Sequence, residues 1–443
     1  MSFDYDLLVV GAGSAGLSAA KTAAQLGAKV AIADPGSLGG TCVNRGCIPK
    51  KFMVYAADFV RQQQQAKHYG WKNISADFDW PTLKTAIHDG LKQIQQSQAK
   101  ALASAGVTVL PNQVRFVDEH SLDLGEHIVT ADKVILAVGA KPVLPDLPGI
   151  DCGVTSRDIF HLEKLPQRLL IVGGGYIGAE FGNLFNLLGC QVTLVDKNPL
   201  ILEGFDDTIR QRVHQSLIDQ GMHLVPETSL ASIEPQGQAK KVHLSDQHDR
   251  ITADVVLLAL GRKPDFSSLD LDKAGVKIET GAIAVDAHSR TSQPSILAVG
   301  DCTNRKPLTP VARAEGSAAA KTLFGPTPVE VSYRWVPSAV FCSPEVASTG
   351  WTEAEAQEQV KAEVHCHTFV PLHYRLTSYQ PESLIKMVVA KDSQEILGVH
   401  MVGDSSPEIL QGLLPALKRG LTLSELSEVI PIHPTSGEEV YDV

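Results

Sequence analysis

The stretch Gly11-Ala12-Gly13-Ser14-Ala15-Gly16 decides the fold that this sequence predicts. An apolar segment, Asp4 to Val10, comes directly before it and is expected to form a β-strand. A helix rich in small residues follows, and a second strand, Lys29 to Ala33, ends at Asp34. A strand, a glycine turn, a helix and a strand that ends in an acid are typical of a βαβ nucleotide-binding unit. The sequence therefore predicts an α/β fold.

Each glycine of this turn has its own physical role. Gly11 permits the tight turn, Gly13 lets the backbone approach a pyrophosphate, and Gly16 lets helix and strand pack closely. The N-terminus of the helix stabilises anionic phosphates. Because Asp34 can accept hydrogen bonds from ribose hydroxyls, we expect a dinucleotide at this turn.

The same unit occurs a second time. Arg168 to Val172 is expected to be a strand, Gly173 to Gly178 is the glycine turn, and Gln191 to Val195 is the next strand. That strand ends at Asp196. We therefore expect a second dinucleotide. The alternative is a second unit kept only as inert scaffold, and the complete set of glycines speaks against it.

A pair of cysteines follows the first unit, in the segment GGTCVNRGCIPKK from Gly39 to Lys51. One tight helical turn would bring Cys42 and Cys47 side by side as a redox-active dithiol. A zinc site needs a second closely spaced pair, and the other five cysteines supply none. A structural disulfide is the other alternative, disfavoured because the chain shows no secretory signal and is expected in a reducing compartment.

Length, charge and hydropathy exclude several classes of function. A chain of 443 residues is expected to form about three domains of ~150 residues each. A net charge of -11 argues against nucleic acid as a partner, because phosphate backbones require clustered lysine and arginine. No apolar run is long enough to cross a membrane. The first strand begins almost directly after Met1, so we expect no signal peptide and a cytoplasmic protein.

The remaining strands and helices follow from the apolar pattern. The strands that end at Val138 and Leu260 are followed by similar glycine turns. In the C-terminal part, apolar and polar residues alternate as in an antiparallel sheet, and an amphipathic helix follows. The expected elements are strands at Val134–Val138, Val255–Leu260, Ile296–Asp301, Val340–Phe341, Lys361–Phe369 and Lys386–Val389, and helices that begin at Leu308–Pro310 and span Pro407–Arg419.

The cysteine segment resembles the redox-active segment of the class I pyridine nucleotide-disulfide oxidoreductases. Its Lys50-Lys51 ending is closest to the glutathione reductases, since lipoamide dehydrogenases and mercuric reductases usually have Pro-Ser-Lys there. This resemblance implies an α/β fold with two Rossmann-like dinucleotide-binding domains and an α+β C-terminal dimerisation domain. The implied domains are an FAD-binding domain at 1–144, an NAD(P)-binding domain at 145–262, a return to the FAD domain at 263–330, and an interface domain at 331–443.

The resemblance also implies the catalytic residues. Cys47 would lie next to the flavin, and Cys42 would be the thiol that attacks a disulfide substrate. The ending Ile432-His433-Pro434-Thr435-Ser436-Gly437-Glu438-Glu439 is similar to the family's His-Pro-Thr motif, in which His433 is the base, Glu438 orients it, and both come from the partner subunit of a homodimer. Lys50 and Glu180 match the family's lysine-carboxylate pair beside the flavin, with Lys51 as the alternative lysine.

Contacts to the two cofactors, FAD and a nicotinamide dinucleotide, follow from the same resemblance. Tyr176 matches the tyrosine that covers the nicotinamide pocket, although an ordinary packed aromatic is the alternative interpretation. No metal site is expected. The implied cofactor-binding residues are Gly11, Gly13, Ser14, Ala15, Gly16, Asp34, Thr41, Val114, Gly139, Asp301, Thr309, Gly173, Gly175, Tyr176, Ile177, Gly178, Asp196, Gly261 and Arg262.

The second unit favours NADH over NADPH. NADPH-dependent members bind the 2′-phosphate with two arginines, at positions where this chain has Lys197 and Glu203. Asp196 at the strand end can instead accept hydrogen bonds from a free 2′-hydroxyl. The alternative is that Asp196 only caps a loop while Lys197 binds the phosphate.

Glutathione disulfide or a close low-molecular-weight analogue is the expected substrate. The chain departs from glutathione reductases at Lys21, Gln98 and Ser317, whereas Arg45 is shared with plant and cyanobacterial members and Arg313 could replace the charge missing at Ser317. A dihydrolipoamide dehydrogenase and a flavoprotein redox sensor without turnover are the alternatives.

Overall fold

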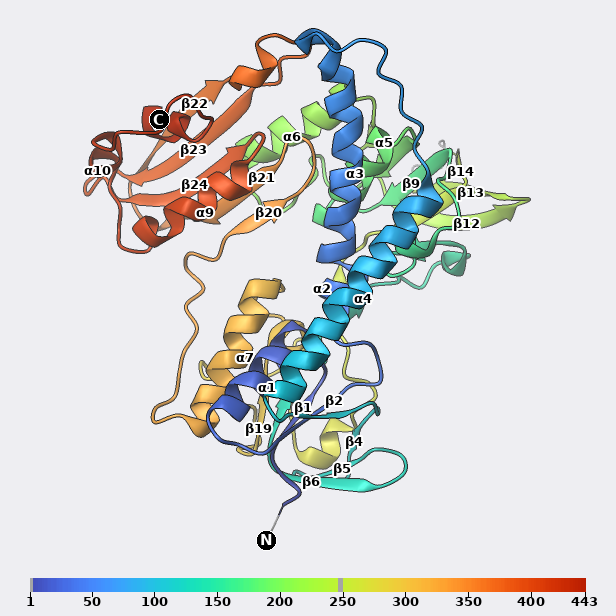
Figure 1. The fold of residues 1–443 in the computed structure, drawn as a ribbon, viewed down its shortest axis with the longest axis vertical. Coiled ribbons are helices and arrows are strands. Elements are labelled where there is room, and N and C mark those ends of the chain that lie inside the picture. Colours follow the sequence, from blue (N-terminus) through green and yellow to red (C-terminus); the bar gives the residue numbers. More distant parts are fainter. Residues whose placement is uncertain (1–2, 246–249) are drawn as a thin grey trace. The chain divides into compact units, whose positions relative to one another are not determined.

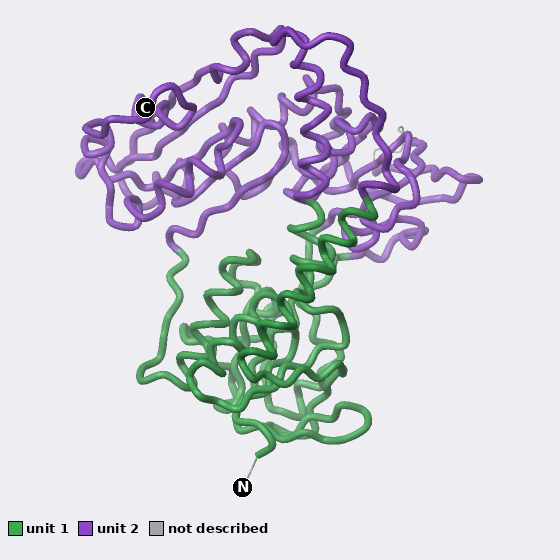
Figure 2. Tube along the Cα trace, viewed as in Figure 1, with its two compact units in different colours: residues 1–50, 84–143, 261–333 green, residues 51–83, 144–260, 334–443 purple. Residues whose placement is uncertain are grey.

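The structure is a computed structural model that describes residues 3–245 and 250–443. The chain divides into two compact units, shown in different colours in Figure 2. Unit 1 contains residues up to 50, 84–143 and 261–333, and unit 2 contains residues 51–83, 144–260 and 334–443. Two long helices, α3 and α4, contribute residues to both units.

Unit 1 is built on a mixed sheet whose strand order is β3-β2-β1-β6-β5-β4, with β19 paired to β6. The strands β3, β2, β1, β6 and β19 run parallel. The apolar strands β2 and β19 are fully buried, as is most of β1, whereas β3 lies at the exposed edge of the sheet. The bounds are β1 (Tyr5–Val10), β2 (Val30–Ala33), β3 (Thr108–Leu110), β4 (Arg115–Phe116), β5 (Ser121–Asp123), β6 (Ile128–Leu136) and β19 (Ile296–Ala298).

Helices α1 (Ser14–Gln25) and α7 (Thr309–Phe324) lie side by side in unit 1 (Figure 1). Small residues allow this close approach, because a Cβ atom at Gly316 would lie 2.2 Å from the carbonyl oxygen of Ala15. The other elements with residues in this unit are α2 (Gly40–Arg45), α3 (Cys47–Ala66), α4 (Trp80–Ser104), β7 (Ala140–Pro142) paired with β16 (Arg262–Pro264), β17 (Ile278–Glu279) paired with β18 (Ala282–Ile283), η4 (Leu271–Ala274) and η5 (Gly300–Thr303).

Unit 2 contains a second parallel sheet, with the strand order β11-β10-β9-β15-β8. Helix α5 packs on it as α1 does on the first sheet, so the sheet confirms the predicted repeat. The bounds are η1 (Lys67–Tyr69), η2 (Ile150–Cys152), β8 (Val154–Thr155), η3 (Ile159–His161), β9 (Arg168–Val172), α5 (Tyr176–Leu187), β10 (Gln191–Val195), α6 (Asp207–Asp219), β11 (His223–Val225), β15 (Val255–Leu258) and the antiparallel β12 (Leu230–Gln236), β13 (Ala239–Leu244) and β14 (Arg250–Ala253).

The C-terminal part of unit 2 is an antiparallel sheet of order β20-β21-β24-β23-β22 with helix α9 packed on β21 and β24. Its core includes Ile385, Met387, Met401 and Leu410. This confirms the predicted α+β C-terminal part. The bounds are β20 (Ser338–Val340), β21 (Val346–Gly350), α8 (Glu353–Gln359), β22 (Ala362–Phe369), η6 (Leu372–Tyr374), β23 (Ser383–Ala390), β24 (Ile396–Val402), α9 (Ser406–Leu417), α10 (Leu423–Ser427) and η7 (Glu438–Asp442).

Several predicted strand ends differ from the structure. β19 ends at Ala298 instead of Asp301, and β23 is longer than expected at both ends. β6 and β15 end two residues earlier than expected, before the left-handed residues Gly139 and Gly261, where the chain turns into the paired strands β7 and β16. Phe341 lies outside β20 because its backbone N–H donates to the carboxylate of Glu180 instead of a strand. Among the helices of the described residues, none is both long and apolar enough to span a membrane.

Candidate active site

The two glycine turns have nearly the same geometry. Gly11 and Gly173 adopt left-handed φ angles of 102° and 110°, which favour glycine. A Cβ atom at Gly16 would lie 1.9 Å from the carbonyl oxygen of Gly11, and one at Gly178 would lie 1.9 Å from that of Gly173. No other residue fits these positions, so both turns are built for close backbone packing.

The acids at the two strand ends are also held alike. Asp34 accepts a hydrogen bond from the backbone N–H of Ala12 at 2.6 Å and from the amide two residues further on at 2.7 Å. Asp196 accepts from the backbone N–H of Gly174 and from the amide two residues further on, the latter at 2.7 Å. Each carboxylate therefore braces its own glycine turn. The remaining lone pairs of its oxygens can still accept hydroxyl hydrogens.

Both helix N-termini suit a pyrophosphate. Neither Gly13, at the N-cap of α1, nor Gly175, at the N-cap of α5, offers a side-chain cap, and neither first turn carries an acid. A Cβ atom at Gly13 would find its nearest neighbour, the Cα of Gly40, at 3.9 Å, and one at Gly175 would find no atom within 4 Å. The residues that follow, Ser14-Ala15 and Tyr176-Ile177, open the helices. Backbone N–H groups near the start of an uncapped helix bind phosphate oxygens well.

Arg262 gathers several predicted cofactor residues in unit 1. Its Nη2 atom donates to the carbonyl oxygen of Ala140 at 2.6 Å, lies 3.4 Å from the Thr41 Oγ1 atom, and lies 3.9 Å from the Asp301 Oδ2 atom. Burial raises the pKa of Asp301, and the Arg262 guanidinium opposes this rise. Arg262 therefore lies next to the residues predicted for the first dinucleotide.

Three other predicted contacts are less direct. Gly139 and Gly261 have φ angles of 75° and 94°, and a Cβ atom at either would meet nothing within 4 Å. Val114 is 2% exposed and packs in the core beneath the first sheet. Its side chain has almost no surface for a ligand, so only its backbone could contact a cofactor.

The cysteine segment is not one helical turn, as expected, but two helices. Helix α2 ends at Arg45, and α3 begins at Cys47. Gly46 between them has φ -154° and ψ -118°, which are not helical angles, and a Cβ atom there would lie 2.9 Å from the carbonyl oxygen of Thr41. Cys42 still lies within hydrogen-bonding reach of Cys47.

The two thiols differ in environment. Cys42 is partly buried, and Cys47 is exposed with its Sγ atom 3.6 Å from the Oγ1 atom of Thr309. The hydrogen bond with Cys47 and burial raise the pKa of the Cys42 thiol well above its ordinary range. A thiol is nucleophilic only when ionised, so attack by Cys42 needs a base that takes its proton.

A histidine that the sequence predicts to be this base lies near the C-terminus, in unit 2. The Nδ1 atom of His433 lies 2.8 Å from the Glu438 Oε2 atom, and Glu438 Oε1 accepts from the backbone N–H of Thr435 at 2.9 Å. The Thr435 amide and His433 both lower the pKa of Glu438. The His433 side chain is 80% exposed. An oriented imidazole with its Nε2 edge at the surface suits proton transfer to a group on another molecule.

Lys50 and Glu180 are both buried, at 7% and 4% exposure. Lys50 lies on α3 in unit 1, and Glu180 lies on α5 in unit 2, where its Oε1 atom accepts from the backbone N–H of Phe341 at 2.8 Å. Their pairing stays a prediction. Tyr176, at the start of α5, is 47% exposed.

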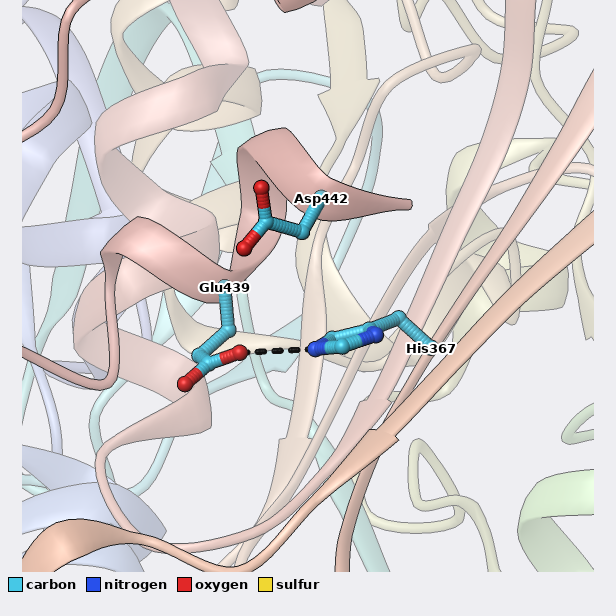
Figure 3. Close-up of side chains that lie close together, drawn as sticks. All are labelled: His367, Glu439 and Asp442. Carbon is cyan, nitrogen blue, oxygen red and sulfur yellow. Dashed lines mark hydrogen bonds and ion pairs between the residues drawn. The ribbon is translucent and has the colours of Figure 1, made fainter.

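A contact that the sequence did not reveal anchors the C-terminal turn. The His367 Nε2 atom, on β22, lies 2.7 Å from the Glu439 Oε2 atom, on η7, and Asp442 extends from the same turn beside them (Figure 3). The three ligand-type atoms lie within 4.8 Å of one another. Glu439 directly follows Glu438, so this contact ties the turn that orients His433 to the sheet. The partners are 72 residues apart, beyond the reach of any local pattern.

Comparison with known proteins covers almost the whole chain. Residues 5–316 match the family described as pyridine nucleotide-disulphide oxidoreductase, and residues 336–443 match its dimerisation domain. The chain is 40% identical to a glutathione reductase of Nostoc sp. over 454 residues, which cover 99% of both proteins. It is 36% identical to a glutathione reductase of Burkholderia cepacia, over 99% of this chain and 98% of the relative. It is 34% identical to a trypanothione reductase of Trypanosoma congolense, over 99% and 95%.

Proposed function

We propose, from the premise that this chain belongs to the pyridine nucleotide-disulphide oxidoreductases, that it reduces glutathione disulfide or a close low-molecular-weight analogue with electrons from NADH. The family implies FAD and a nicotinamide dinucleotide as cofactors, and its dimerisation domain supports a homodimer. The observation that carries the proposal is the adjacent pair Cys42 and Cys47 beside Thr309. A dithiol at this place exchanges electrons with a disulfide.

The residues present fit both cofactors. The first turn, with Asp34, Thr41, Asp301 and Arg262, would hold FAD, and the second turn with Asp196 would hold the nicotinamide dinucleotide. Bound FAD would convert the two-electron hydride of the nicotinamide into an electron pair for the cysteines. The chain contributes orientation, charge and proton transfer.

The cysteines would then carry out two successive exchanges. The Cys42 proton passes to Nε2 of His433 from the partner subunit, and the Cys42 thiolate attacks one sulfur of the disulfide. A mixed disulfide forms, and the first product thiol leaves with the proton held by His433. Cys47 next loses its proton and its thiolate attacks the Cys42 sulfur, which re-forms the Cys42–Cys47 disulfide while the second product leaves as a thiol with that proton. The hydride of NADH, which carries two electrons and one proton, and one proton from solvent then restore the dithiol.

The preference for NADH rests on the charge at the second turn. Glu203 Oε2 accepts a hydrogen bond from Nδ2 of Asn198 at 3.1 Å, and Asn198 also donates its backbone N–H to Asp196. Asn198 thus holds the carboxylates of Asp196 and Glu203 near the same turn, where both would repel a 2′-phosphate. Like charges about 4 Å apart repel by ~4 kcal/mol at an effective dielectric of ~20, and half of this gives roughly thirty-fold discrimination against a 2′-phosphate.

The alternative to NADH binding was that Asp196 only caps a loop while Lys197 binds the 2′-phosphate. Asp196 does brace its turn, but this does not by itself favour Lys197 as a phosphate ligand. Asp34 braces the first turn in the same way. The bracing is therefore a property shared by both sites and compatible with ribose binding.

Steady-state kinetics test the proposal. The purified holoenzyme is assayed with glutathione disulfide, trypanothione disulfide and lipoamide, each with NADH and with NADPH. We expect the highest kcat/KM with glutathione disulfide and NADH. A preference for lipoamide would indicate a dihydrolipoamide dehydrogenase instead, and reduction of the cysteines without turnover of any disulfide would indicate a redox sensor. Equal or better efficiency with NADPH would refute the proposed nucleotide preference.

A further inference from the structure

A carboxylate that has no part in the reaction is buried in the middle of helix α7. Glu315 is 1% exposed. Its Oε2 atom accepts a hydrogen bond from the backbone N–H of Gly300 at 2.6 Å, and its Oε1 atom accepts from the hydroxyl of Tyr333 at 2.6 Å. The guanidinium of Arg305 lies 3.2 Å from the same Oε1 atom. Three donors therefore converge on one buried charge.

Burying a carboxylate is costly unless donors replace its hydration. An apolar side chain at position 315 would avoid this desolvation cost. The carboxylate is therefore explained by the hydrogen bonds that it accepts. The Glu315 carboxylate connects α7 to Gly300. The backbone N–H of Gly300 lies at the turn between β19 and η5. Gly300 has a φ angle of 75°, and a Cβ atom there would lie 3.2 Å from the Cβ of Ala15. Gly300 therefore offers only backbone groups as anchoring points for this turn.

The residue after this turn is the cofactor residue Asp301. Asp301 faces Arg262 at 3.9 Å, and Arg262 in turn reaches Thr41, the neighbour of Cys42. Thr309, at the N-terminus of α7, lies 3.6 Å from the Cys47 sulfur. Glu315 joins these two parts of unit 1, since it fastens helix α7, which carries Thr309, to the start of η5, which carries Asp301.

We propose that Glu315 is a positioning residue for FAD. By holding the amide of Gly300 it fixes the position of the next residue, Asp301, so that the Asp301 carboxylate can accept hydrogen bonds from bound FAD. The inference rests on the proposed function only in taking FAD as the cofactor. It does not depend on which disulfide or which nicotinamide dinucleotide the enzyme uses.

Two variants separate this role from a merely stabilising one. Glu315→Gln places an N–H group opposite either the Gly300 amide or the Tyr333 hydroxyl and Arg305, because an amide has only one acceptor oxygen. Tyr333→Phe is the matched control. It removes one hydrogen bond from the same carboxylate and leaves the Gly300 contact in place.

The measurement is release of FAD from the holoenzyme. Purified protein is diluted at a temperature well below unfolding, and the rise in flavin fluorescence gives the dissociation rate and the bound fraction, while circular dichroism follows the fold. We expect Glu315→Gln to weaken FAD retention about ten- to a hundred-fold, the change that a lost hydrogen bond to a charged group produces. Tyr333→Phe is expected to remain within about three-fold of the unmodified protein, well below that range.

The proposal is wrong if Glu315→Gln retains FAD as the unmodified protein does, or if both variants lose FAD equally and only in step with their unfolding. Should Glu315→Gln not be recovered folded, Glu315→Asp is measured in the same way. It keeps the charge but shortens the side chain by one methylene, and FAD retention equal to that of the unmodified protein would likewise overturn the proposal. Because no disulfide substrate is added in this experiment, failure of the proposed substrate assignment leaves its result unaffected.

Discussion

At the scale of single residues, the chemistry depends on how each functional group is surrounded. Cys42 is partly buried beside Cys47, and both influences keep its proton on. His433 has its Nδ1 edge bound to Glu438 and its side chain at the surface. The thiol needs a base before it can attack, and the exposed, oriented imidazole is a group that can accept a proton. This complementarity is the physical reason to join them in one reaction.

The raised pKa of Cys42 predicts a pH dependence of alkylation. A raised pKa means less thiolate at a given pH, so carbamidomethylation of Cys42 in reduced His433→Ala enzyme should speed up about ten-fold per pH unit from pH ~7 to ~9. In the unmodified enzyme the rate should be faster at pH ~7 and depend less on pH, because the His433 side chain takes the proton. Mass spectrometry of the modified peptide gives the rate for Cys42 alone. Identical pH profiles for the two proteins would contradict the role of His433.

The charges at the second turn predict a change of nucleotide preference. Replacing Asp196→Val, Lys197→Arg and Glu203→Arg together removes two carboxylates and adds a bidentate phosphate-binding charge. The ratio of kcat/KM for NADPH to that for NADH should rise at least thirty-fold, roughly the discrimination expected from repulsion. The single variant Lys197→Arg serves as control and should change the ratio by less than about three-fold, because both carboxylates remain. A triple variant that still prefers NADH to the same degree would show that the carboxylates are not responsible.

At the scale of elements, a buried ionic cluster joins the second dinucleotide-binding domain to the C-terminal sheet within unit 2. Lys386, on β23, is 2% exposed and donates to Asp206, at the N-cap of α6, at 2.8 Å and to Glu353, on α8, at 2.7 Å. Burial alone would raise the pKa of Asp206, but the hydrogen bond from Lys386 lowers it below its ordinary value. For Lys386 burial lowers the pKa and these carboxylates raise it.

Removing the lysine should therefore destabilise the protein in a pH-dependent way. Lys386→Met leaves Asp206 buried without its cation, which costs about 3–5 kcal/mol and should lower Tm by at least ~5 °C at pH 7. The folded pKa of Asp206 lies below its unfolded value, so its stabilising contribution is present above pH ~4 and lost as the pH falls through the folded pKa. The difference in Tm between variant and unmodified protein should thus shrink toward acid pH.

Thermal unfolding followed by circular dichroism measures this difference. Lys391→Met, an exposed lysine directly after β23, is the control and should leave Tm within about 1 °C, as expected for a surface position. A Lys386→Met effect that is as small as the control, or that grows as the pH is lowered, would refute the assigned role of the cluster.

At the scale of the whole molecule, the proposed reaction needs two subunits. The cysteines lie in unit 1 near the N-terminus, and His433 lies in the matched dimerisation domain. Mixed dimers of Cys42→Ala and His433→Ala subunits should regain activity, because one of their two sites combines an intact Cys42 with an intact His433. Random exchange of equal amounts makes half of the dimers mixed, and each has one complete site, so about a quarter of the unmodified activity is expected.

Exchange is verified by native mass spectrometry of subunits that differ in mass. Each variant alone serves as the baseline, and a mixture of Cys42→Ala with Cys42→Ser subunits is the matched control, because no combination of these restores the thiol. Demonstrated exchange without recovery of activity would show that the sites are not shared between subunits.

Most of the architecture followed from local sequence. Apolar strands, glycine turns and terminal acids recur at 4–34 and 168–196 because dinucleotide binding needs a particular backbone geometry, and only certain residues can adopt it. The alternating apolar pattern likewise predicted the antiparallel C-terminal sheet. Ends of elements were less accurate, because hydrogen bonds to distant groups, such as that from Phe341 to Glu180, decided where a strand stops.

The sequence by itself determined the two glycine turns, the cysteine pair and the His433–Glu438 dyad, because each depends on residues close together in the chain. Only the tertiary structure decided that Gly46 separates two helices at the cysteines and that Arg262 meets Thr41 and Asp301. It also decided that Glu315 holds the Gly300 amide. These contacts join segments whose spacing in the sequence carries no periodic signal. They arise because a buried charge or amide must find a partner wherever the packing of the chain provides one.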